Sequence, residues 1–183
     1  MGNEKGTGRS VRDTGRRLCA ILVLVVAIAV LFTPVTLVAF ATQGDFRVHM
    51  GIAWTWRETG HLTWPHFLYH LLTILLSYLM PGGSLNIAGF TISMLAYVAL
   101  GMVIYDAVCG AVASRRGKCV SVLSLIITLS LMLVSPVNLF TLPIRNLYLG
   151  YISPTVYHNP TLILLKPVAL LLFFSGLRVF DNS

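Results

Sequence analysis

The feature that most constrains this chain is a run of 23 residues, Leu18 to Phe40, that contains no charged side chain. An α-helix rises about 1.5 Å per residue, so a helix of this length crosses the roughly 30 Å hydrocarbon core of a bilayer. The apolar core of a secretory signal peptide is shorter, about 7–15 residues, and no clear small-x-small cleavage motif precedes Gln43. We therefore predict a transmembrane helix, bent at Pro34.

Further apolar runs define the fold class. Ile87–Val112, Val120–Phe140 and Leu162–Phe180 are long enough to span, whereas Pro65–Met80 is short for a full span. Charged residues make up 10% of the chain and the mean hydropathy is +0.82, against roughly 25% charged residues in soluble domains. The prediction is an all-α, polytopic integral membrane helical bundle over residues 18–180, with about four transmembrane helices plus interfacial helices in the first external loop.

Basic residues orient these helices. Residues 1–17 are polar, Gly-rich and basic, and we expect a disordered cytoplasmic tail. If Pro65–Met80 crossed the membrane, five spans would place Arg115-Arg116-Gly117-Lys118 outside, against the positive-inside rule. If that segment is interfacial or re-entrant, four spans keep the tail, this loop and Arg178 in the cytoplasm. We favour four spans with the N-terminus in the cytoplasm and the basic clusters contacting anionic lipid head groups.

One polar stretch, Gly44–His70, stands between apolar runs and contains Asp45, four of the five histidines and all three tryptophans. With four spans, it shares the outer face with a second polar stretch, Tyr148–Thr161. Asp45 directly follows the first span. A carboxylate there acts either as a helix cap or as a general base or metal-linked group, so Asp45 is the candidate catalytic residue.

The start of this stretch is predicted to be an amphipathic helix in the membrane interface, with its tryptophans at head-group depth. The residues of its predicted apolar face are Phe46, Met50, Ala53 and Trp54, with Asp45, His49 and Trp56 turned away.

The histidines have two interpretations. A polar stripe runs along the following helix through His66, His70, Thr73 and Ser77. In one interpretation this stripe is a hydrogen-bonded polar face. In the other, His66 and His70 bind a metal with His49 or His61. Because any i,i+4 pair on a helix has this spacing, we predict no metal site and take His49, His66 and His70 as candidate substrate-binding residues.

The second stretch adds His158, Asn159 and Lys166 to the candidate substrate-binding residues. His158-Asn159-Pro160-Thr161 is also typical of a turn followed by a helix start, because Pro is accepted in a first turn. Lys166 lies about one turn inside the last apolar run. It either extends its ammonium group to the head groups or supplies a cation for a lipid phosphate. Asp106, near the cytoplasmic end of its span, is expected to be interfacial or to face the bundle.

Two short motifs carry a resemblance to a known family. The first span is followed by Gly44-Asp45-Phe46-Arg47-Val48-His49 and then by Pro65-His66-Phe67-Leu68-Tyr69-His70. This order resembles the start of polytopic GT-C-type glycosyltransferases, in which an acidic residue opens a first external loop containing helices along the membrane. Tyr157-His158-Asn159-Pro160-Thr161, followed by Lys166-Pro167, is similar to uncharacterised bacterial membrane proteins of that broad type. The likeness covers residues 18–180.

The resemblance implies sugar transfer from a polyprenyl-phosphate donor on the external face. Asp45 stands at the position of the family's first-loop acid, and Lys166 and His158 would contact the donor phosphate or the acceptor. Such enzymes normally have more spans. The resemblance therefore implies a truncated or partial module, an N-terminal half that needs a partner chain supplying further spans, or a reduced protein that is inactive alone.

Two other classes stay open. The chain is alternatively a small non-enzymatic integral membrane protein, acting as a subunit, scaffold or lipid-binding partner. A metal or proton transporter using the histidines is a third class, although it would need more acidic residues within the spans. We expect no nucleic-acid partner, because no basic face with interleaved aromatic residues exists. The sequence identifies no cofactor, and the three cysteines lack metal-binding spacing.

Overall fold

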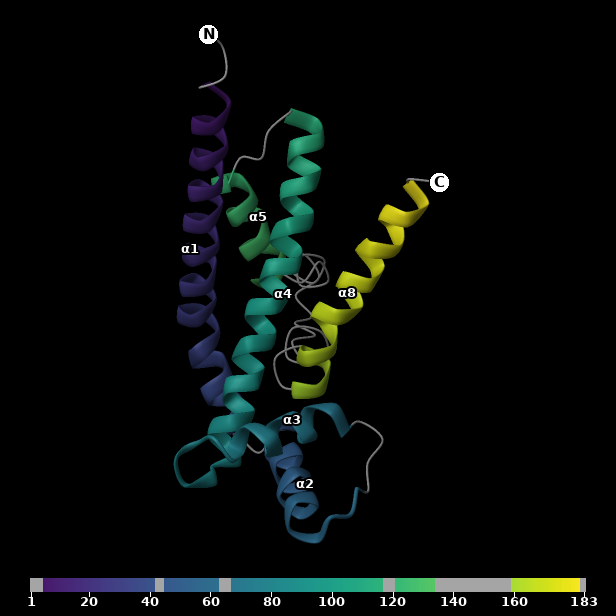
Figure 1. Cartoon of the computed structure of the whole chain (residues 1–183). Coiled ribbons are helices and arrows are strands. Elements are labelled where there is room, and N and C mark those ends of the chain that lie inside the picture. The colour runs from purple at the N-terminus through teal and green to yellow at the C-terminus, as the bar shows by residue number, and fades with distance from the viewer. Residues whose placement is uncertain (1–4, 42–44, 63–66, 117–120, 134–158, 182–183) are drawn as a thin grey trace, which may run out of the picture.

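The computed structural model describes residues 5–41, 45–62, 67–116, 121–133 and 159–181, which form helices and short turns with no β-strand among them (Figure 1). The elements are α1 (Lys5–Ala41), α2 (Asp45–Thr59), α3 (Phe67–Ser77), the 3-10 helix η1 (Pro81–Gly83), α4 (Leu85–Arg116), α5 (Ser121–Leu133) and α8 (Pro160–Asp181). The predicted all-α fold class is confirmed for this part of the chain.

Three helices are long and apolar enough to cross a bilayer: Gly15–Ala41 in α1, Leu85–Ser114 in α4 and Pro160–Leu177 in α8. The apolar helices α3 and α5 are shorter, with 11 and 13 residues. Helix α5 covers the first part of the predicted span Val120–Phe140, and the rest of that run lies outside the described residues. The long apolar helices confirm a polytopic membrane bundle.

The N-terminal tail differs from its prediction. Helix α1 has 37 residues and begins at Lys5, so residues 5–17, which we expected to be disordered, are helical. Extending an existing helix adds about one backbone hydrogen bond per residue without a new nucleation cost. The apolar part of α1 supplies the nucleus. The helix then continues through arginines, which have high helix propensity.

The helices place the described parts of the two polar stretches, residues 45–62, 67–70 and 159–161, at one end of the bundle. The start of α1, the end of α8 and the last turns of α4 lie at the other end, which we call the terminal end (Figure 1). Helices α2 and α3 lie at the opposite end, which we call the α2–α3 end, near the first turns of α8. Helix α3 returns the chain to α4 without crossing the bundle, as expected for an interfacial or re-entrant segment.

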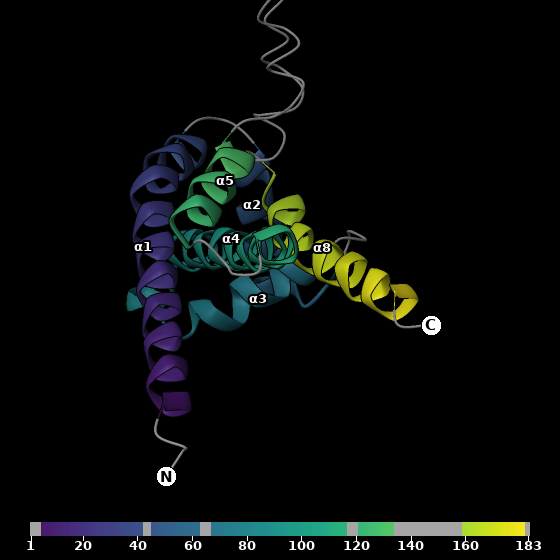
Figure 2. The ribbon, with the colours of Figure 1, turned by 90° about the horizontal axis from the view of Figure 1, so that it is seen from above.

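Helix α4 is central and contacts α1, α2, α3, α5 and α8 (Figure 2). The core towards α1 includes Leu24, Ile28 and Phe32, whose ring lies 4.6 Å from that of Tyr97. A Cβ atom at Gly101 of α4 would meet the side chains of Ile28 and Met132. Small residues at such crossings let helix backbones approach closely, which is how helices associate in lipid.

Buried hydroxyl groups in these helices donate to carbonyl oxygens of their own helix, three or four residues earlier. These donors are Thr36, Thr73, Ser77, Ser93 and Thr128. Each bond satisfies a polar group that would otherwise cost free energy in an apolar interior.

Candidate functional site

Helix α2 presents its apolar face to α3 and α4 nearly as predicted. Phe46, Met50 and Ala53 are buried, as expected. Trp54 is 56% exposed. Trp56 instead packs against a cluster of buried side chains that includes Met50, Tyr69 and Ile92. The prediction was therefore wrong for these two tryptophans. Successive residues of a helix are rotated by about 100° around its axis, and the packed face of α2 is centred near Ala53. Trp54 therefore lies at the edge of this face, and His49 lies close to it.

His49 and His70 form a pair that joins α2 to α3. Nδ1 of His49 lies 2.8 Å from Nε2 of His70, and the ring centroids are 5.0 Å apart. One nitrogen must donate and the other must accept, so this hydrogen bond forbids the state in which both rings are protonated. His70 is buried with Thr73 and Ser77, so the described part of the predicted polar stripe faces protein.

Tyr69 supports this pair, although the sequence did not single it out. The Tyr69 hydroxyl donates to the carbonyl oxygen of Gly89 at 3.0 Å and lies 3.4 Å from Oγ of Ser93. Its ring packs edge-on against the rings of His49 and His70. Burial raises the pKa of the Tyr69 phenol well above its usual range, so the group stays a neutral donor.

Gly89 makes this arrangement possible. A Cβ atom there would lie 2.9 Å from Oη of Tyr69 and 2.8 Å from Cε of Met50. A side chain at this position of α4 would therefore displace the tyrosine that stacks on the histidine pair. In the sequence, the only sign of this close approach was a glycine inside an apolar helix, four residues before Ser93.

Asp45 and Asn159 bring the two polar stretches together. Nδ2 of Asn159 donates to Oδ2 of Asp45 at 3.3 Å, across 114 positions in sequence. The other amide atom, Oδ1 of Asn159, accepts from the backbone N–H groups of Thr161 at 3.1 Å and Leu162 at 3.3 Å. Asn159 is thus the N-cap of α8 and fixes its first turn to the start of α2.

The electrostatic setting favours a carboxylate at this point. Asp45 is the first residue of α2, and Asn159 directly precedes α8. Each helix N-terminus carries a partial positive charge of roughly half an elementary unit, which attracts negative charge. His49 lies one turn further along the same face of α2. We call Asp45, His49, His70 and Asn159 the polar cluster.

Lys166 lies half-buried in α8, seven residues beyond Asn159. Seven residues correspond to about 10 Å along the axis and about two turns, so both side chains share one face of α8. Helical side chains lean towards the N-terminus of their helix, and the N-terminus of α8 is at Asn159. His66 and His158 lie outside the described residues, so their candidate roles stay predictions. Among the described residues, no group of three His, Cys, Asp or Glu side chains could hold a metal.

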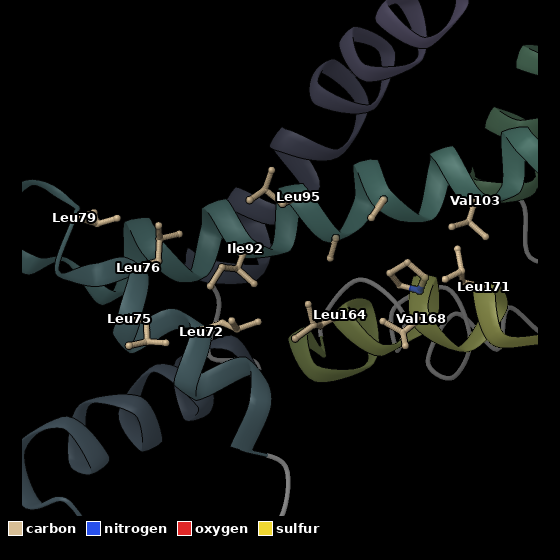
Figure 3. Close-up of a pocket in the computed structure, with 13 residues that line it drawn as sticks. Leu72, Leu75, Leu76, Leu79, Ile92, Leu95, Val103, Leu164, Val168 and Leu171 are labelled. Atoms are coloured by element: carbon tan, nitrogen blue, oxygen red, sulfur yellow. The ribbon is translucent and has the colours of Figure 1, made fainter. Parts of the chain in front are cut away.

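An apolar groove of about 680 Å³ opens between α3, α4 and α8 (Figure 3). Its walls include Leu72 of α3, Ile92 of α4 and Leu164 of α8, which point into the same space. Leu72 lies two residues after His70, and Leu164 lies about one turn after Asn159. The groove thus lies near the α2–α3 end of the bundle, and no member of the polar cluster lines it.

Comparison of the chain with models of protein families, with curated proteins and with solved structures finds no match in any of the three.

Proposed function

We propose that this protein is a GT-C-like membrane glycosyltransferase module that transfers a sugar from a polyprenyl-phosphate donor. The observation that supports the proposal most is the Asp45–Asn159 hydrogen bond. It holds an acidic side chain at the start of α2, one helical turn before His49, at the end of the bundle where the apolar groove reaches α3. These are the elements that a lipid-linked sugar and its acceptor require.

In the proposed reaction, an acceptor hydroxyl attacks the anomeric carbon of the sugar. The bond from that carbon to the phosphate oxygen breaks, and the polyprenyl phosphate leaves with the electron pair. Asp45 accepts the hydroxyl proton as general base. Lys166 offsets the charge of the leaving phosphate, and the His49–His70 pair hydrogen-bonds the sugar or the acceptor. His66, His158 and Asn159 complete the proposed substrate contacts.

The polyprenyl chain would lie in the groove between Leu72 and Leu164, with its phosphate towards the polar cluster. We place the polar cluster outside a bacterial plasma membrane and the N-terminus in the cytoplasm, because Arg17, Arg116, the start of α1 and the end of α8 share the opposite end. A partner chain would supply further spans for activity.

A second candidate is a non-enzymatic membrane protein that binds a lipid. The observation that favours it is the apolar lining of the groove, which fits a lipid chain with or without chemistry at Asp45. The two candidate functions predict different results when Asp45 is replaced by a neutral residue.

The test is sugar transfer in proteoliposomes from a panel of polyprenyl-phosphate-linked sugars, with the chain alone and with membrane proteins encoded beside it. Asn caps a helix about as well as Asp but accepts no proton in this range. Asp45→Asn should therefore fold normally and lose transfer, whereas Glu58→Gln, an equal charge change on α2, should keep it. Full transfer by Asp45→Asn would overturn the catalytic role. Lipid binding without transfer by the intact protein would favour the second candidate.

A further inference from the structure

A second pocket, of about 330 Å³, lies at the terminal end between α1, α4 and α8. Its walls include Ile21, Phe174 and Ser175, and it ends at the charged side chains of Arg17 and Asp106. The apolar groove at the α2–α3 end and this pocket are both lined by Val103 of α4 and Leu171 of α8. Together they form one cleft along α4 and α8. Both volumes fall in the roughly 300–1,000 Å³ range of ligand sites.

The lining of the cleft changes from apolar to charged along its length. Beside α3 it is lined by leucine, isoleucine, valine, alanine and proline side chains, and at the terminal end it reaches an ion pair. Nη2 of Arg17 donates to Oδ1 of Asp106 at 2.6 Å, which ties α1 to α4. A guanidinium group has five N–H donors in a planar fork, so a carboxylate and a phosphate can bind it together.

The terminal end is also the basic end of the molecule. Its basic residues in the described helices are Lys5, Arg9, Arg12, Arg16, Arg17, Arg115, Arg116 and Arg178, against the acidic residues Asp13, Asp106 and Asp181. Such an excess of positive charge attracts anionic lipids. A cleft that is apolar inside and cationic at its mouth is complementary to one anionic phospholipid.

We propose that this cleft binds an anionic phospholipid from the leaflet at the terminal end. Its phosphate contacts Arg17, and one acyl chain lies between α4 and α8 beside Val103 and Leu171. Asp106 is a positioning residue that holds the guanidinium at the mouth. The Arg17 contact lies at the opposite end of the bundle from the polar cluster and does not depend on the proposed sugar transfer, although the cleft behind it includes the groove proposed for the polyprenyl chain.

The experiment measures binding of phosphatidylglycerol and phosphatidylcholine, with identical acyl chains, to the full chain in detergent. Because a ligand that binds only the folded state raises its stability, thermal unfolding at increasing lipid concentration gives each Kd. One cationic contact near the membrane surface corresponds to about a five-fold preference for phosphatidylglycerol. Arg17→Gln should reduce this ratio to about one, whereas Arg16→Gln, the same charge change one residue away, should retain it.

A second pair of variants tests the acyl-chain part of the cleft. Leu171→Trp fills the junction of the two pockets and should weaken binding of both lipids. Leu172→Trp, its exposed neighbour outside both linings, should not. The proposal is overturned if Arg17→Gln keeps the phosphatidylglycerol preference, or if Leu171→Trp binds both lipids like the unchanged chain. It is also overturned if neither lipid raises the thermal stability of the unchanged chain.

Discussion

Substitution of Gly89 by alanine gives the sharpest test of how the polar cluster is built. A Cβ atom at this position would lie 2.9 Å from Oη of Tyr69 and 2.8 Å from Cε of Met50. Met50 ends in a flexible side chain and can move. Tyr69 cannot move without breaking its hydrogen bond to the Gly89 carbonyl oxygen, because its ring is buried against α4.

The magnitude follows from three opposing contributions. Gly→Ala inside a helix stabilises by about 1 kcal/mol. Overpacking at a tight site costs about 1–3 kcal/mol. Loss of the tyrosine hydrogen bond costs about 0.5–1.5 kcal/mol more. We expect Gly89→Ala to destabilise the protein by about 1–3 kcal/mol in reversible denaturant titrations in mixed micelles.

Gly110 supplies the matched control on the same helix. A Cβ atom at Gly110 meets nothing within 4 Å, so Gly110→Ala should be neutral or slightly stabilising. Removing the tyrosine oxygen should relieve the clash, so Tyr69→Phe and Gly89→Ala together should cost less than the sum of the single changes. Equal stability of Gly89→Ala and Gly110→Ala would refute the reasoning.

Two further predictions concern α8 and the orientation in the membrane. Asn159→Ala removes the N-cap of α8 and should destabilise the protein by about 0.5–2 kcal/mol. Asn159→Asp should keep the cap but place a second carboxylate beside Asp45. Urea titration of the two variants in detergent separates the loss of the cap from the effect of the added charge. With the native cysteines replaced, an impermeant thiol reagent outside intact cells should label Thr59→Cys and not Ser114→Cys, and labelling of Ser114→Cys would reverse the proposed orientation.

Helix class and general arrangement could be predicted because they depend on composition and on counting crossings. The long apolar runs required transmembrane helices, and the basic residues required an even number of crossings between Arg17 and Arg178. That parity predicted that the Gly44–His70 and Tyr148–Thr161 stretches share the outer face, and the hydrogen bond between Asp45 and Asn159 shows that the described parts of the two stretches meet.

Contacts that depend on helix rotation could not be predicted. The His49–His70 bond and the packing of partly buried Trp56 depend on how α2 turns towards α3 and α4, and no local sequence pattern specifies that rotation. Tyr69 was missed for a related reason. A tyrosine in an apolar helix has the same sequence signature whether its hydroxyl reaches lipid head groups or a neighbouring helix.

The buried hydroxyl groups that donate to carbonyl oxygens of their own helix affect how the protein assembles. A buried serine or threonine that donates to its own helix is satisfied before that helix meets a neighbour, so each helix can enter the bilayer separately. The Asp45–Asn159 bond has no such independence, because its two halves lie near opposite ends of the chain. Since synthesis proceeds from the N-terminus, Asp45 is synthesised long before α8 emerges from the ribosome. The Asp45–Asn159 link therefore forms only when the last described helix docks, and a nascent chain stalled before Asn159 leaves the polar cluster incomplete.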